Sequence, residues 1–190
     1  MNVPLFLTWL RIAAIPLLVM VFLFAPEDSA RPLSAWIFGL AAATDFLDGY
    51  LARRWNQQSS FGAFLDPVAD KLIVAAALIL LVYANGDIWL VLASIVIIGR
   101  EILISALREW MAETGNRAAV AVSQMGKWKT IAQMLAIMFM LNWFPLWDVV
   151  PVYQIGYGLL MFSAVLALVS GTLYGLAAWR AVRAQKLRQV

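Results

Sequence analysis

The chain has 190 residues, 64% of them hydrophobic, with 14 basic and 11 acidic residues, no histidine and no cysteine. At this length a water-soluble core cannot absorb so much apolar surface, so we expect the bilayer to be the solvent for most of the chain. The missing residue types exclude disulfides, a Ser-His-Asp triad and thiolate or imidazole metal sites. Any metal must therefore be held by oxygen ligands, which favours Mg²⁺, Mn²⁺ or Ca²⁺.

Six apolar segments of membrane-spanning length follow one another along the chain, at about 5–25, 34–54, 64–84, 88–111, 125–143 and 152–178. The first segment has no basic stretch ahead of it and no small-x-small cleavage site, so we expect a retained helix and not a signal peptide. Short polar or turn-like stretches separate the segments. The expected fold class is all-α: one membrane-embedded domain over residues 1–190, a compact bundle of six transmembrane helices.

The basic residues indicate the orientation of this bundle. With six spans both termini lie on one side, and the opposite side holds Arg31 as its only basic residue, beside four acids. The positive-inside rule then places both termini at the cytoplasmic face of the membrane. The net charge of +3 fits this reading better than nucleic-acid binding, because the basic residues are spread over loop ends. We expect the basic tail over residues 180–188 to contact anionic lipid.

Four of the acidic residues lie close together, between positions 45 and 70. An ionised carboxylate in or near hydrocarbon costs several kcal/mol, so such groups pair, bind metal or line a wet cavity. Asp45 and Asp48 share a face of the second predicted helix, and Asp66 and Asp70, spaced i,i+4, share a face of the third. The two helices are antiparallel, so both faces can meet at the cytoplasmic interface. Two divalent ions would neutralise the four carboxylates and leave coordination positions for a diphosphate.

Small residues accompany these acids. Gly49, Ala52, Gly62 and Ala63 remove side-chain bulk and make room for a flat ligand such as a nucleotide base. Arg53 lies on the flank, where it can pair with a phosphate or an acid. A helix-packing seam with structural ion pairs would explain the small residues, but it would not explain four acids at these spacings.

The spacing D-x₂-D-G-x₂-A-R-x₈-G-x₃-D-x₃-D resembles the signature of the CDP-alcohol phosphotransferases, integral membrane enzymes of phospholipid synthesis. Its fixed positions are filled by Asp45, Asp48, Gly49, Ala52, Arg53, Gly62, Asp66 and Asp70. Residues 52–57, 61–71 and 100–113 are similar to the bacterial members that transfer a phosphatidyl group from CDP-diacylglycerol to glycerol 3-phosphate and release CMP. Members with another acceptor, such as inositol phosphate, serine or choline, share the signature and remain an alternative.

The resemblance implies roles for individual residues. Asp45, Asp48 and Asp66 would be metal ligands, and Asp70 would be a ligand that also serves as the general base. The positions that would contact the CDP moiety are Gly49, Ala52, Arg53, Ser59 and Gly62. Two Mg²⁺ ions are implied, with Mn²⁺ as a possible substitute. The location implied is the bacterial cytoplasmic membrane, with the active site at the cytoplasmic face.

Glycerol 3-phosphate is an anion, so its pocket should carry basic groups near the metals. Candidates cluster at the cytoplasmic ends of the fourth and fifth predicted helices: Arg108, Arg117, Lys127 and Lys129. Arg108 is the best placed, because it lies on a predicted span and not in a loop. Arg100 and Glu101 lie deeper on the same span, and we hypothesise that they line the cavity.

Two further interpretations come from the sequence. Gly171 and Gly175 form a small-x₃-small pattern in the last predicted helix that could pack helices within one subunit or in a homodimer. A different class of function, a metal or ion transporter with an intramembrane acid relay, is the alternative to an enzyme. The position of the acids at one interface, away from the bilayer midplane, argues against that alternative.

Overall fold

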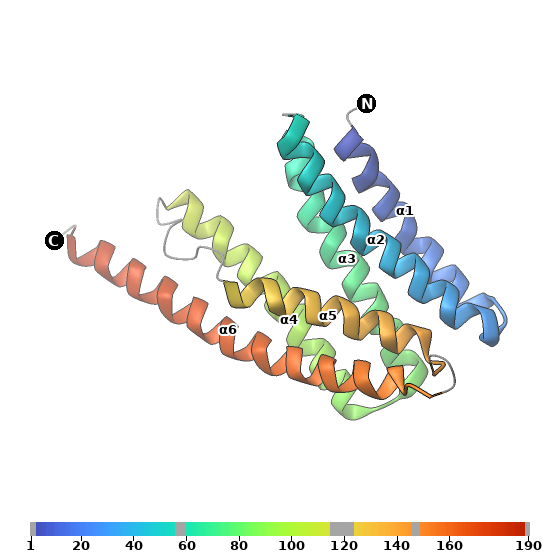
Figure 1. Ribbon diagram of the computed structural model, residues 1–190. Coiled ribbons are helices and arrows are strands. Elements are labelled where there is room, and N and C mark those ends of the chain that lie inside the picture. The colour runs from blue at the N-terminus through green and yellow to red at the C-terminus, as the bar shows by residue number, and fades with distance from the viewer. Residues whose placement is uncertain (1–2, 56–59, 115–123, 146–148, 189–190) are drawn as a thin grey trace.

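The computed structural model describes residues 3–55, 60–114, 124–145 and 149–188, with the side chains of residues 3–5, 45–55, 60, 63, 124–129 and 184–188 outside the description. This part of the chain contains helices and no strands. The helices are α1 (Val3–Phe24), α2 (Glu27–Trp55), α3 (Ser60–Asn85), α4 (Ile88–Glu113), α5 (Gln124–Asn142) and α6 (Val152–Arg188) (Figure 1). The predicted all-α chain of six helices is confirmed for these residues.

Four described helical segments are long and apolar enough to cross a membrane: Phe6–Phe24, Phe64–Asn85, Ile88–Glu113 and Val152–Arg183. The described part of α5 contributes a shorter apolar segment, Thr130–Asn142. Large apolar side chains such as Trp36, Leu40 and Ile95 are exposed on the outer surface of the bundle. An outer surface of this kind suits a lipid environment, in which apolar side chains need no protein cover.

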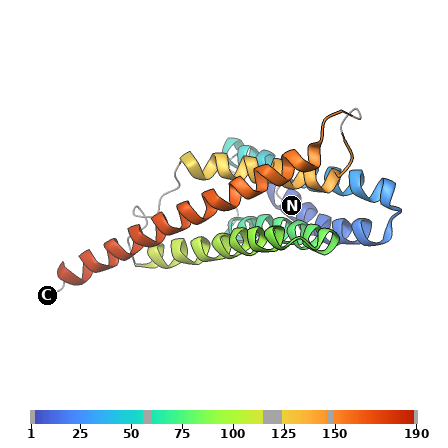
Figure 2. The same cartoon turned by 90° about the horizontal axis from the view of Figure 1, so that it is seen from below.

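Two helices, α2 and α6, extend the furthest beyond their predicted bounds. α2 begins at Glu27 and not near residue 34, because the backbone N–H groups of Ser29 and Ala30 donate to the Pro26 carbonyl at 3.0 and 2.8 Å. Acidic residues in this first turn interact favourably with the helix dipole, although their polarity resembles that of a loop. α6 continues past residue 178 to Arg188, and its C-terminal end projects beyond the neighbouring helices (Figure 2).

A cluster of aromatic and polar side chains joins the turn between α3 and α4 to the start of α6. The Tyr153 hydroxyl donates to Asn85 Oδ1 at 2.9 Å, and the Tyr157 hydroxyl donates to the carboxylate of Asp87. Asp87 is also the N-cap of α4, accepting from the Trp89 N–H at 3.1 Å. These bonds hold the end of α3 and the beginning of α4 against α6.

The other helices reach the same end of the bundle. The guanidinium of Arg31, near the start of α2, lies 4.7 Å from the ring centre of Phe22 at the end of α1. It also lies 5.0 Å from the ring centre of Trp143, which follows α5 and contacts Tyr153 at a ring-centre distance of 4.4 Å. Cation–π and aromatic contacts of this kind add about 0.5–1 kcal/mol each. Consecutive helices therefore alternate in direction, and the opposite end gathers the start of α3 and the end of α2.

The helices pack through small residues. The main core contains Phe38, Leu78, Ile97 and Ile137, interleaved with buried alanines from α2, α3, α4, α5 and α6. Helices α5 and α6 approach each other closely at Gly156, where a Cβ atom would lie 2.8 Å from the Ala136 carbonyl oxygen and 2.9 Å from Phe139 Cβ. Only glycine allows the two helices this separation.

We therefore predict that Gly156→Ala lowers the free energy of unfolding by about 1–3 kcal/mol, because the added methyl group forces α5 and α6 apart. Gly158→Ala, two residues along the same helix, is the matched control, since a Cβ there has no neighbour within 4 Å. Thermal unfolding in detergent measures both. Equal stability of the two variants would contradict the close packing of α5 against α6.

The bond between Tyr157 and Asp87 also predicts a pH dependence. It lowers the pKa of Asp87 from 3.8, helped by the N-cap bonds and opposed by desolvation. A lowered pKa in the folded state stabilises the protein above the unfolded pKa, and this contribution is lost as the pH falls through the folded pKa. Tyr157→Phe should therefore reduce the loss of thermal stability between about pH 6 and pH 3. An unchanged acid profile would show that the bond is absent in solution.

Candidate active site

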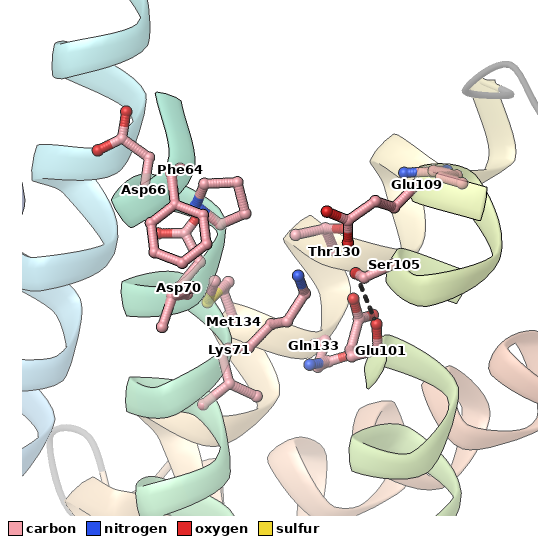
Figure 3. A pocket seen from close by; sticks show the side chains of 14 residues that line it. Phe64, Asp66, Asp70, Lys71, Glu101, Ser105, Glu109, Thr130, Gln133 and Met134 are labelled. Atoms are coloured by element: carbon pink, nitrogen blue, oxygen red, sulfur yellow. Dashed lines mark hydrogen bonds between the residues drawn. The ribbon is translucent and has the colours of Figure 1, made fainter. Parts of the chain in front are cut away.

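Asp66 and Asp70 lie one helical turn apart near the start of α3 and line the same cavity (Figure 3). Between them, Pro67 stands inside the helix and has no backbone N–H to donate to the preceding turn. Gly62, one turn before Asp66, is buried. The predicted pair of acids on one α3 face is therefore present, with a buried glycine one turn before it.

Two side chains of α1 bind these two acids. The Thr8 hydroxyl donates to Asp66 Oδ1, and Arg11 Nη1 lies 2.5 Å from Asp70 Oδ1. Thr8 and Arg11 are 0% and 1% exposed, whereas the Asp70 side chain is 34% exposed. Arg11 is the only charged residue of α1. A lone arginine in an apolar helix is a signal for an intramembrane partner, but the sequence did not indicate which acid it would meet.

The remaining residues of the predicted metal and nucleotide site are only partly described. Asp45, Asp48, Gly49, Ala52 and Arg53 belong to the last turns of α2, but their side chains lie outside the described residues. Ser59 lies outside them altogether. Within the described part of the chain, no group of three acids is close enough to hold a metal ion. The convergence of α2 and α3 acids therefore stays a prediction.

The described acids suit an oxygen-ligated divalent cation. A carboxylate offers about four lone-pair sites, so a hydrogen bond from Thr8 or Arg11 leaves capacity for a metal. Two carboxylates on one helix face beside an open cavity are the kind of partial ligand set that Mg²⁺ completes with water and phosphate oxygens. The donor chemistry fits the predicted ion.

An open cavity of about 650 Å³ lies between α3, α4 and α5. In Figure 3 the α3 residues form one wall and the α4 residues Glu101, Ser105 and Glu109 the other. The Ser105 hydroxyl donates to the Glu101 carbonyl at 2.8 Å. The charged and polar lining residues are Asp66, Asp70, Lys71, Glu101, Ser105, Arg108, Glu109, Thr130 and Gln133. The cavity is thus polar enough, and large enough, for a small charged substrate beside Asp70.

The arginines of α4 are engaged with α6. Arg108 lines the cavity, but its Nη2 donates to the Tyr174 hydroxyl at 3.4 Å and its guanidinium lies 5.3 Å from the Tyr174 ring centre. Arg100 pairs with Glu101 at 3.2 Å and donates to Ser170 at 3.3 Å. Glu101 lines the cavity as hypothesised. Arg100 is not among the lining residues, because it turns toward α6.

The other basic residues predicted to bind the acceptor are less defined. Lys127 and Lys129 lie at the start of α5 with side chains outside the described residues, and Arg117 lies outside them entirely. A Cβ on Gly171 would lie 3.5 Å from Arg100 Cγ of the same chain, whereas a Cβ on Gly175 would have no neighbour within 4 Å. The small-x₃-small pattern therefore has one position that packs within the subunit.

The chain is similar to known proteins over most of its length. The family model of the CDP-alcohol phosphatidyltransferases matches residues 1–172. A Haemophilus influenzae protein is 54% identical over 136 residues, which cover 72% of this chain and 73% of that protein. A Salmonella choleraesuis protein is 51% identical and a Shigella flexneri protein 49% identical, each over 170 residues, or 89% of this chain and 90% of theirs. All three are named CDP-diacylglycerol–glycerol-3-phosphate 3-phosphatidyltransferase.

The contact between α1 and α3 predicts a stability effect. Arg11→Met leaves the Asp70 carboxylate without its partner, and breaking a buried ion pair in this way costs about 3–5 kcal/mol. Because Asp70 is partly exposed, we expect a loss near the lower bound, measured by thermal unfolding in detergent. Arg183→Met, on an exposed part of α6, serves as the control. If both variants unfold at the wild-type temperature, the pair does not hold α1 against α3.

Proposed function

The chain belongs to the CDP-alcohol phosphatidyltransferase family, and we propose that it transfers the phosphatidyl group of CDP-diacylglycerol to glycerol 3-phosphate. The products are phosphatidylglycerol phosphate and CMP, so the reaction serves phosphatidylglycerol and cardiolipin synthesis. The observation that carries this proposal is an identity of 51% over 89% of the chain to a relative named for that reaction. The two α3 acids beside a polar cavity provide the chemistry it requires.

We propose that the metal site joins Asp45 and Asp48 of α2 to Asp66 and Asp70 of α3, in keeping with the divalent-metal dependence that is general in this family. Two Mg²⁺ ions, or Mn²⁺ in their place, would neutralise the diphosphate of the donor and the charge of the leaving CMP. Thr8 and Arg11 hold the α3 carboxylates in place through their hydrogen bonds. Such supporting contacts orient metal ligands.

The CDP moiety would bind beside these acids. Gly49, Ala52 and Gly62 leave room for the cytosine ring and ribose, because none of them carries a side chain larger than a methyl group. Arg53 and Ser59 supply polar groups for the phosphates and the nucleoside. The buried position of Gly62, one turn before Asp66, is the described feature that supports this subsite.

The acceptor would enter through the open cavity between α3, α4 and α5. Its primary hydroxyl attacks the β-phosphorus of CDP-diacylglycerol, the phosphoanhydride bond breaks so that CMP leaves, and Asp70 accepts the hydroxyl proton. A carboxylate suits this role in a chain without histidine. The basic residues proposed to bind the acceptor phosphate are Arg108, Arg117, Lys127 and Lys129. Arg108 is supported by its place in the cavity wall.

We propose that all six helices cross the bacterial cytoplasmic membrane, with both termini and the active site on the cytoplasmic side. The alternating helix directions support six crossings. The excess of basic residues at the end of the bundle that carries Asp66 and Asp70 supports the orientation. In a homodimer formed through α6, Gly175 would be the contact residue, because Gly171 packs on Arg100 within the chain.

The proposal predicts CMP release when purified protein is given CDP-diacylglycerol, Mg²⁺ and glycerol 3-phosphate. Asp70→Asn should lower kcat at least about 100-fold, because an amide accepts no proton. Asp87→Asn makes the same change at the opposite end of the bundle and should leave turnover intact. CMP release with inositol phosphate, serine or choline and none with glycerol 3-phosphate would reassign the acceptor. Full activity of Asp70→Asn would contradict its role as the base.

A further inference from the structure

Lys71 follows Asp70 directly on α3 and was not among the basic residues predicted to bind the acceptor. It is partly buried and lines the cavity. Figure 3 shows its side chain extending from α3 into the space between α3 and α4. Consecutive residues of a helix point about 100° apart. Lys71 therefore lines the cavity beside Asp70, but its side chain leaves α3 in a different direction.

The ammonium group of Lys71 has no hydrogen bond or ion pair within the described part of the chain. The two acids on the opposite wall do not neutralise it: Glu101 pairs with Arg100 at 3.2 Å, and Glu109 forms no ion pair with Lys71 in the described structure. An unpaired cation in a partly buried site near hydrocarbon is costly, so residues of this kind mark ligand-binding positions. The missing partner is an anion.

A second side chain in the same cavity also lacks a partner. Gln133 of α5 is 4% exposed, and its amide oxygen is buried without a hydrogen bond among the described residues. A buried acceptor of this kind costs about 1–3 kcal/mol until a donor reaches it. An alcohol can supply that donor. An anion would therefore be the partner of Lys71, and a hydroxyl group would be the partner of Gln133. Glycerol 3-phosphate carries both groups in one molecule.

The charge balance of the cavity points the same way. Its described charged residues are four acids and two cations: Asp66, Asp70, Glu101, Glu109, Lys71 and Arg108. The guanidinium of Arg108 is already engaged with the Tyr174 hydroxyl. Without Lys71 the described wall would repel an anionic substrate. The phosphate of glycerol 3-phosphate is three carbons from its attacking hydroxyl, so it must bind near Asp70, where Lys71 projects.

We propose that Lys71 binds the phosphate of the acceptor and makes the site selective for phosphorylated alcohols. This inference rests on the proposed function. It assigns Lys71 a role in binding the acceptor, separate from the proton transfer at Asp70. The other substrate, CDP-diacylglycerol, binds on the side of the α2 acids.

The test is steady-state CMP release with glycerol 3-phosphate varied at saturating CDP-diacylglycerol. Lys71→Gln should raise the KM for glycerol 3-phosphate by about 10- to 100-fold, the usual effect of losing a hydrogen bond to a charged group. Its kcat and its KM for CDP-diacylglycerol should change much less. Lys71→Arg keeps the positive charge and should restore most of the affinity. Arg183→Gln, the matched loss of a cation on exposed α6, should leave all three constants unchanged.

Thermal unfolding of each variant separates loss of folding from loss of binding. An unchanged KM in folded Lys71→Gln, or an equal rise in the KM for both substrates, would overturn the inference while the wild-type enzyme still releases CMP. A wild-type protein that releases no CMP with any alcohol would overturn the proposed function instead. The two failures are thus distinguishable.

Discussion

The pairing of Arg11 with Asp70 and of Thr8 with Asp66 is the constraint on which the active-site end of this protein depends. Burying a guanidinium inside an apolar bundle is unfavourable unless a carboxylate compensates it. That requirement holds α1 against α3 and fixes the rotation of α3 about its axis, because Asp66 and Asp70 must both face α1. The same rotation turns the flanking residue Lys71 toward α4. The charge pattern of the cavity therefore depends on the contact of α3 with Thr8 and Arg11, which do not line the cavity.

The two ends of the bundle are stabilised in different ways. At the end opposite the acids, tyrosines of α6 hold the turn between α3 and α4, and Arg31 lies between aromatic rings of α1 and α5. These contacts are made within the protein and join all the helices that meet at this end. At the other end, the Lys71 ammonium group and the Gln133 amide oxygen have no partner among the described side chains around an open cavity. One end of the bundle is therefore held together by contacts within the protein, whereas the other end has an open cavity that suits a small polar substrate.

Much of this architecture could be predicted from the sequence, because hydropathy alone sets the number and approximate bounds of the helices. The i,i+4 spacing of Asp66 and Asp70 likewise predicted their common face. The start of α2 could not be predicted, because Glu27 and Asp28 resemble a loop until the Pro26 carbonyl is seen to accept helical hydrogen bonds. The partner of Arg11 and the engagement of Arg108 with Tyr174 also escaped prediction. Both contacts depend on how each helix is rotated about its axis relative to its neighbours. The spacing of residues in a single sequence shows which residues share a face, but it does not show which helix that face meets.

The central claim is that acids of α2 and α3 form one divalent-metal site. Anomalous diffraction from crystals grown with Mn²⁺ and CDP tests it most directly. Manganese peaks are expected about 2.0–2.2 Å from carboxylate oxygens of Asp66 and Asp70 and of Asp45 and Asp48. Peaks that lie away from these four residues would contradict it.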